Sequence, residues 1–205
     1  SLLAIGEGAQ ASITDQITSV GTNLLVVMPG AVQAHGPGAG IQGASGSATT
    51  LINEDAEAIA APGNVPSAQV VAPEYSKNTQ VIFGDANINT SVTGVTAEYQ
   101  DAYDLAVASG RFIEEKDVDK RANVVVLGYQ AAEDLFGGFD PVGQKGKVAL
   151  PDGQGRIALT VVGVLEEEGD SVMGSSDDRV YVPISTAQIK LFNARNPKGE
   201  IMVSR

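Results

Sequence analysis

Apolar residues along the chain follow two spacings, one typical of helices and one typical of strands. Over residues 2–20 they recur every four positions, at Ile5, Ala9, Ile13 and Ile17, with polar residues between them. This period predicts an amphipathic helix. Continuous or alternating apolar runs predict strands elsewhere. These runs are Leu24–Met28, Val65–Tyr75, Gln80–Phe83, Asn87–Val95, Val124–Leu127, Ile157–Leu165 and Val180–Ile184.

Capping and stop residues predict further, shorter helices. Asn53 is a candidate N-cap for a helix that ends before Pro62. Residues 129–136 form a second predicted helix, which Gly137 ends. Residues 185–188 read Ser-Thr-Ala-Gln, the pattern of a capping box that opens a third helix.

Turns and loops connect these elements. Gly84 and Asp85 predict a tight hairpin turn between two of the strands, and residues 109–112 predict another turn. Residues 31–50 and the polar residues 166–179 lack periodicity and are predicted to be loops. Hairpins mixed with scattered short helices favour an α+β fold.

Composition excludes several classes of function. The 205 residues contain no Cys, one His and no Trp, and their net charge is −12. Thiolate chemistry, Cys-based zinc or iron–sulfur sites and sites with several imidazoles are therefore excluded. The negative charge repels phosphate backbones, so no nucleic-acid partner is expected. No apolar run approaches the roughly 20 residues of a membrane span.

The loop at 31–50 contains two features that could suggest a binding or catalytic site, but neither has the sequence context that such a site needs. Residues 38–43 have the G-x-G-x-x-G spacing of a dinucleotide-binding loop. Such a loop must join a strand directly to a helix, and here prolines and small residues intervene. His35 has no second His and no neighbouring carboxylate, so we expect an exposed imidazole.

Carboxylates cluster at residues 114–117, 166–168 and 177–178. They lack the spacing of a calcium loop, and we expect solvated acidic surfaces. For Asp177 and Asp178 we expect hydrogen bonds to the backbone of the loop before them. Asn89 begins a glycosylation sequon that nothing else in the sequence supports. No catalytic, cofactor-binding or metal-ligating residue is predicted.

A series of segments occurs in order along nearly the whole chain, at residues 6–9, 13, 17, 21–30, 52–59, 71–75, 92–99, 109–112, 117–118, 126–128, 135–137, 140–144, 161–165 and 177–188. Together they resemble the extracytoplasmic core domain of MacB-type and FtsX-like ABC transporter permeases. The chain also starts at Ser1 inside an apolar stretch and stops within a strand-like run, so we expect a piece of a longer protein.

The resemblance implies a porter-like subdomain of mixed strands and helices with an inserted sabre-like α/β subdomain. Residues 1–100 would form a membrane-proximal helix and the porter-like part, residues 101–184 the sabre-like part, and residues 185–205 the return to an incomplete porter-like part.

It also implies a non-catalytic domain on the extracytoplasmic side of the cytoplasmic membrane, held there by membrane helices outside these residues. Implied partners are a second permease subunit in a homodimer or heterodimer, an ABC ATPase subunit or domain, and a possible periplasmic adaptor. Such a domain would couple ATP hydrolysis mechanically to export, and no cofactor is implied.

Two other functions stay open at this point. A free-standing interaction or ligand-binding module would use the loops at 31–50 and 166–179 as contact surfaces. An acid-pair hydrolase would require two carboxylates that converge in a pocket, roughly 5 to 9.5 Å apart. The candidates for that pair are Glu114, Asp117, Glu166 and Asp177.

Overall fold

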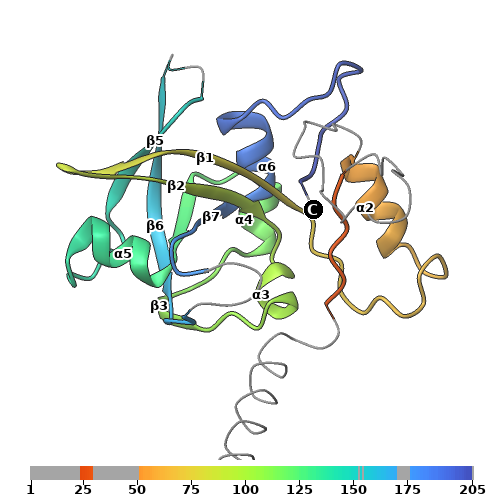
Figure 1. The fold of residues 1–205 in the computed structure, drawn as a ribbon, viewed down its shortest axis with the longest axis horizontal. Coiled ribbons are helices and arrows are strands. Elements are labelled where there is room, and N and C mark those ends of the chain that lie inside the picture. Colours follow the sequence, from red (N-terminus) through yellow and green to blue (C-terminus); the bar gives the residue numbers. More distant parts are fainter. Residues whose placement is uncertain (1–23, 30–50, 152, 154, 170–175, 205) are drawn as a thin grey trace, which may run out of the picture.

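The structure is a computed structural model that describes residues 24–29, 51–151, 153, 155–169 and 176–204. The predicted helix at 2–20 and the loop at 31–50 lie outside these residues. Figure 1 shows a body of strands and helices, beside which lie α2 and the C-terminal segment. The helices are α2 (Asn53–Ala60), α3 (Tyr99–Ala102), α4 (Glu115–Asp119), α5 (Tyr129–Phe136), α6 (Ile184–Thr186) and the π-helix η1 (Ala187–Leu191). The strands are β1 (Glu74–Phe83), β2 (Ala86–Val95), β3 (Val107–Gly110), β4 (Val124–Leu127), β5 (Lys145–Ala149), β6 (Arg156–Leu165) and β7 (Val180–Pro183).

The strands form one sheet that closes on itself. Their order is β3-β6-β4-β7-β2-β1-β5, and β5 pairs with β6 as well as with β1. Six strands therefore make a closed ring, while β3 pairs, among the described strands, with β6 alone. The β2–β7 and β4–β6 pairs are parallel and the others antiparallel. This mixed sheet with short helices confirms the predicted α+β class.

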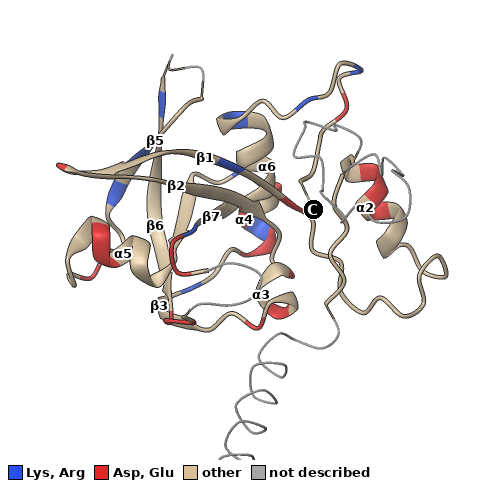
Figure 2. Ribbon diagram, in the orientation of Figure 1, with Lys and Arg blue, Asp and Glu red and all other residues tan. Residues whose placement is uncertain are grey.

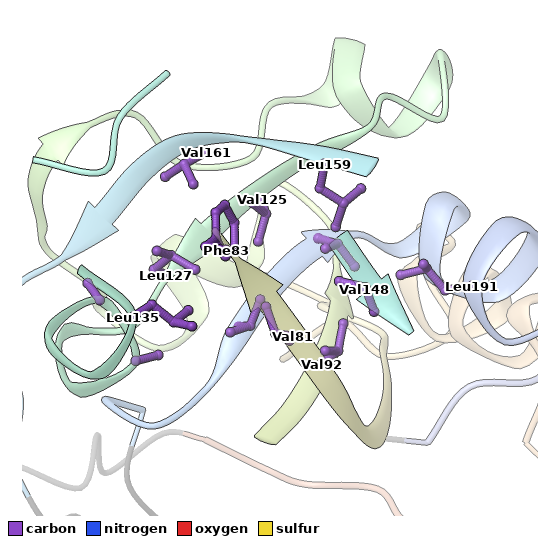
Figure 3. Close-up of a cluster of buried hydrophobic side chains, with 14 of the residues drawn as sticks. Val81, Phe83, Val92, Val125, Leu127, Leu135, Val148, Leu159, Val161 and Leu191 are labelled. Carbon is purple, nitrogen blue, oxygen red and sulfur yellow. The ribbon is translucent and has the colours of Figure 1, made fainter. Parts of the chain in front are cut away.

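The main core fills the inside of this ring. Figure 3 shows its side chains converging from strands on all sides and from α5 and η1. Each buried Leu, Val or Phe contributes about 1.5–3 kcal/mol relative to an exposed position. The labelled members are Val81, Phe83, Val92, Val125, Leu127, Leu135, Val148, Leu159, Val161 and Leu191.

A second, aromatic-rich cluster lies on the other face of the sheet. In β4, Val125 and Leu127 belong to the first cluster, whereas Val126 belongs to the second. This alternation follows from the two-residue period of a strand. The rings of Tyr99 and Tyr181 lie 5.9 Å apart within it. Both faces of β4 are thus buried, which explains its unbroken run of valine and leucine.

Locally encoded elements were predicted well. Strands β1 and β2 pair along their full length, from Glu74–Val95 to Phe83–Ala86, around the predicted turn at Gly84. Helix α5 has the predicted bounds, and Gly137 follows it with φ of +59°. This left-handed conformation suits glycine because glycine has no Cβ.

Other predictions were wrong. Residues 24–28 and 65–73 contain no strand, and β1 runs without a break through residues 76–79, where no strand was predicted. The turn predicted at 109–112 overlaps β3, and β5 was not foreseen. Pro183 ends β7, which has partner strands on both sides.

Both cap predictions were also wrong. Ile52, not Asn53, is the N-cap of α2, and its N–H donates to Asp55 at 2.9 Å. The helix after β7 begins at Ile184, before the predicted capping box, and no side chain caps its N-terminus by a hydrogen bond. The side chains of Ser185 and Gln188 bond to distant segments instead. Long-range partners therefore replaced the local ones that the sequence pattern suggested.

The sheet crosses the boundary predicted at residue 100. Strands β1 and β2, which precede it, pair with β5 and β7, which follow it. The division into residues 1–100, 101–184 and 185–205 stays a prediction, and strand pairing does not follow it.

Candidate functional site

An apolar groove of about 800 Å³ lies beside α2. It is lined by residues 24–27, 51, 56, 59, 65, 67–73, 101–103 and 203. Several of its side chains are open to solvent: Leu25 is 86% exposed, and Val65 and Val70 are nearly half exposed. A contiguous exposed apolar surface of this kind marks a place where another group packs.

The C-terminal segment, residues 201–204, joins the groove to the sheet. The Asn53 N–H donates to the Ile201 carbonyl at 3.0 Å, and the Val203 N–H donates to the Leu51 carbonyl at 3.1 Å. One residue further, the Ser204 N–H donates to the carbonyl of Glu74 in β1 at 2.6 Å. The segment therefore bonds to α2 on one side and to the first residue of the sheet on the other.

Gln188, in η1, makes the corresponding link through its side chain. Only 2% of Gln188 is exposed. Its Nε2 donates to Asn53 Oδ1 at 2.8 Å and to the carbonyl of Met202 at 3.0 Å. One buried amide thus holds together the start of α2, the C-terminal segment and the helix that follows β7. Loss of such a donor leaves two acceptors without their partner.

Helix η1 is itself seated closely on the sheet. A Cβ placed on Gly94 of β2 would lie 2.4 Å from the Ala187 Cβ, so only glycine permits the observed approach. This contact fixes the position of Gln188, one residue further along η1. We call the set of contacts made by Gln188, Gly94–Ala187 and residues 201–204 the junction.

A buried carboxylate and two tyrosines lie next to the junction. Tyr99 OH donates to Glu74 Oε2 at 3.0 Å, and Glu74 is only 1% exposed. Burial, followed by the negative charge of Glu74, raises the pKa of Tyr99 above its usual range. Burial also raises the pKa of Tyr181. Both phenols are therefore protonated donors at physiological pH.

Asp117 contradicts the solvated acidic surface predicted at 114–117. It is 5% exposed and accepts two hydrogen bonds from Arg111, at 2.6 and 3.2 Å, and one from the Glu114 N–H at 3.1 Å. Burial alone would raise the pKa of Asp117, but these hydrogen bonds and the Arg111 charge outweigh it and lower that pKa. The pair ties α4 to the end of β3. Glu115 and Lys116 are exposed, as expected, whereas Glu114 is half-buried.

Asp177 has the predicted role. Its two carboxylate oxygens accept hydrogen bonds from the backbone N–H groups of Glu168 and Gly169, at 3.0 and 2.9 Å. Glu166, Glu167 and Glu168 are exposed, as expected.

Of the four candidate carboxylates, the structure brings Glu114 and Asp117 together, since both pair with Arg111, at 3.6 and 2.6 Å. Asp117 and Asp177 each serve a separate local network, and no group of three or more His, Asp or Glu among the described residues could hold a metal ion. Asn89 lies exposed on β2. His35 and residues 38–43 lie outside the described part of the chain. Sequence reasoning missed the roles of Gln188 and Glu74, because their partners are far away in the sequence.

None of the helices described in the structure combines the length and the apolar content that a bilayer crossing requires.

Comparison with known proteins shows which proteins this chain is similar to. The family of MacB-like periplasmic core domains matches residues 1–204. The macrolide export ATP-binding/permease protein MacB of Azoarcus sp. (strain BH72) is 34% identical over 196 residues, which are 95% of this chain and 27% of that protein. MacB of Hyphomonas neptunium is 36% identical over 94% of this chain and 28% of that protein. The pyoverdine export ATP-binding/permease protein PvdT of Pseudomonas syringae pv. tomato is 30% identical over 100% of this chain and 28% of that protein.

Solved structures share the fold. The periplasmic region of MacB from Actinobacillus actinomycetemcomitans superposes with a TM-score of 0.66 at 23% identity, over 92% of this chain and 77% of that one. The extracellular domain of the noncanonic ABC-type transporter YknZ from Gram-positive bacteria gives a TM-score of 0.58 at 21% identity, over 75% and 70% of the two chains.

The fold is thus that of the extracytoplasmic domains of ABC transporter permeases. The chain belongs to the family of MacB-like periplasmic core domains, which confirms the resemblance seen in the sequence. It spans little more than a quarter of the length of the curated relatives it matches.

Proposed function

We propose that this chain is the non-catalytic, extracytoplasmic part of an ABC transporter permease, and that it transmits a displacement produced by ATP hydrolysis to the exported substrate. Membrane helices outside these residues anchor it to the cytoplasmic membrane. Its partners are a second permease subunit, identical or different, and an ABC ATPase subunit or domain that acts through the membrane region. A periplasmic adaptor is a further proposed partner. Export is the activity named for the macrolide and pyoverdine relatives.

The observation that supports mechanical transmission is the junction. Rigid-body motion passes between parts of a protein only where they are firmly joined. Here the C-terminal segment bonds to α2 and to β1, and Gln188 bonds to that segment and to Asn53. A displacement applied to residues 201–204 therefore moves the sheet and α2 together.

The complete gene provides the first test. Apolar spans of about 20 residues should flank this segment, one before it and three after it. A complete gene product without such spans contradicts the proposal at once.

A coupling variant tests the mechanism in the full-length transporter, reconstituted in vesicles with its ATPase. We expect Gln188→Ala to leave ATP hydrolysis near the wild-type rate and to reduce export, because the link to Met202 and Asn53 is lost. The matched control is Gln130→Ala, since Gln130 is an exposed glutamine on α5. Equal export by the Gln188 and Gln130 variants, with both folded, would refute the role of the junction.

A disulfide tests whether the junction moves as one unit. Ile52 and Met202 face each other in an antiparallel bridge, and such pairs have Cα separations of about 4.5–5.5 Å, which a disulfide can span. These 205 residues contain no Cys, so the double variant Ile52→Cys/Met202→Cys introduces one pair of cysteines into them. We expect oxidation to leave export unchanged. Export that stops on oxidation and returns on reduction would mean that these segments separate during the cycle.

The apolar groove supports a second candidate, a ligand-binding module. Its volume of about 800 Å³ and the exposed side chains of Leu25, Val65 and Val70 suit an apolar small molecule. Calorimetric titration of the isolated chain with a macrolide distinguishes the two functions. Saturable binding that Leu25→Ser abolishes, in a chain whose complete gene lacks membrane spans, would favour the binding module.

A further inference from the structure

A second, smaller groove lies between β3 and α5, away from the junction. Its volume is about 370 Å³, and Ala108 and Ser109 of β3 form one wall. Tyr129 and Glu133 of α5, with Phe139 from the loop after it, form the other. Figure 1 shows α5 and β3 on the side of the sheet body opposite α2.

The groove carries exposed aromatic side chains. Phe139 is 80% exposed and Tyr129 is 36% exposed, and on the sheet body they are the two large apolar side chains open to solvent among the described residues. Gly137 and Gly138, with φ of +59° and +86°, turn the chain sharply just before Phe139. An exposed phenylalanine held at the rim of a groove is typical of the central contacts of protein interfaces.

The charge around the groove is negative. Glu133 and Asp140 line it, and none of the described lining residues is Lys or Arg. Asp134 is also exposed on α5, which Figure 2 shows with acidic and no basic residues. Glu166 follows Leu165, another lining residue, and is exposed. The negative charge of these carboxylates attracts a basic partner and repels an anionic membrane surface.

The backbone of β3 adds a further contact. Because the other six strands close into a ring, β3 ends the strand order, and one of its edges has no partner strand in the described chain. Such an edge offers N–H and C=O groups to an extended peptide.

We propose that this groove binds an extended peptide segment of a partner protein, in which an apolar side chain lies between Lys or Arg residues. The apolar side chain packs against Phe139 and Tyr129, the basic residues pair with Glu133 and Asp140, and the backbone lies along β3. The site is separate from the junction, so this proposal can be correct or wrong independently of the proposed mechanical role.

The test selects from a library of random short peptides displayed on phage against the immobilised 205-residue chain. Selected peptides should pair Lys or Arg with an apolar residue, and binding should weaken as salt rises. Fluorescence anisotropy then gives the affinity of one synthetic peptide for each variant. We expect Phe139→Ser and Glu133→Lys each to weaken binding about tenfold or more. Both residues are exposed, and thermal unfolding should show that the variants are folded.

Matched controls place the binding site. Leu25→Ser removes an equally exposed apolar side chain from the other groove, and Glu57→Lys makes the same charge change on α2. Both should bind the peptide as the wild type does. Peptides without basic residues, or binding that Phe139→Ser leaves intact, would overturn the proposal. Flotation of the wild type, but not of Phe139→Ser, with vesicles of phosphatidylcholine and phosphatidylglycerol would also overturn it, because the groove would then be a membrane contact.

Discussion

Adding one methyl group at Gly94 should weaken the packing of η1 against the sheet and destabilise the domain. In Gly94→Ala the new Cβ would lie 2.4 Å from the Ala187 Cβ and 3.1 Å from the Ile184 Cα. Carbon atoms pack at about 3.5–4.0 Å, so the helix must move away by roughly 1 Å. Overpacking of this kind costs about 1–3 kcal/mol. For a chain of this size a loss of about 2 kcal/mol lowers Tm by roughly 4–8 °C.

The same contact provides a rescue. Ala187→Gly removes the opposing methyl group, at a cost of about 1 kcal/mol for glycine inside a helix. The double variant should then be more stable than the sum of the two single losses predicts, by about 1 kcal/mol or more. Gly155→Ala is the control, because its Cβ would meet only the end of the Leu150 side chain, at 3.3 Å.

Urea unfolding followed by circular dichroism gives the four free energies of unfolding. Additive losses in the double variant, or a Gly94→Ala variant as stable as Gly155→Ala, would refute the close contact between β2 and η1.

Three further outcomes are expected of the same chain. Leu127→Ala should lower the free energy of unfolding by about 2–5 kcal/mol in urea, because Leu127 is fully buried, whereas the exposed Leu25→Ala should change it by less than about 0.5 kcal/mol. Folding lowers the pKa of Asp117, so its ionised form stabilises the chain above the unfolded-state pKa; the Tm advantage of the wild type over Asp117→Asn should be full at neutral pH and shrink below about pH 4. Folding raises the pKa of Tyr99 and Tyr181, so in an alkaline titration their tyrosinate absorbance should appear only when circular dichroism reports unfolding.

Local signals in the sequence were enough for part of the fold. Residues 124–127 are four consecutive β-branched or leucine residues, and the structure buries the last three of them, on both faces of the strand. Gly137 ends α5 because the left-handed turn needs a residue without a Cβ. In each case the residue and the feature that it determines lie within a few positions of each other.

Strand β5 shows why other elements could not be predicted. Its sequence, Lys-Gly-Lys-Val-Ala, has low strand propensity. It forms because it pairs with β1 and β6 at once, and Gly146 leaves room for the Phe83 ring, whose carbons would lie 2.4 Å from an added Cβ. Those partners are distant in the sequence, so no local window reveals them.

The junction escaped prediction for the same reason. Asn53 and Gln188 both fit the local pattern of helix caps, and each uses its side chain for a bond to the other across 135 positions of sequence. Asp117 was closer to prediction, since Arg111 lies only six positions before it. A basic residue next to a short acidic helix can indicate a buried ion pair. The acidic residues at 114–117 were nevertheless predicted to form a solvated surface.

The closed ring connects the two surfaces of the domain. In an open sheet one strand can slide past its neighbour, but in the ring β6-β4-β7-β2-β1-β5 each strand is paired on both sides, so sliding would break two sets of hydrogen bonds. The sheet body should therefore turn as one piece. A partner bound at β3 would pull on β6, and the ring would carry that load to β2, where the Gly94–Ala187 contact passes it to Gln188 and the C-terminal segment. The order of pairing thus makes the mechanical role and the peptide groove compatible, although each can be tested without the other.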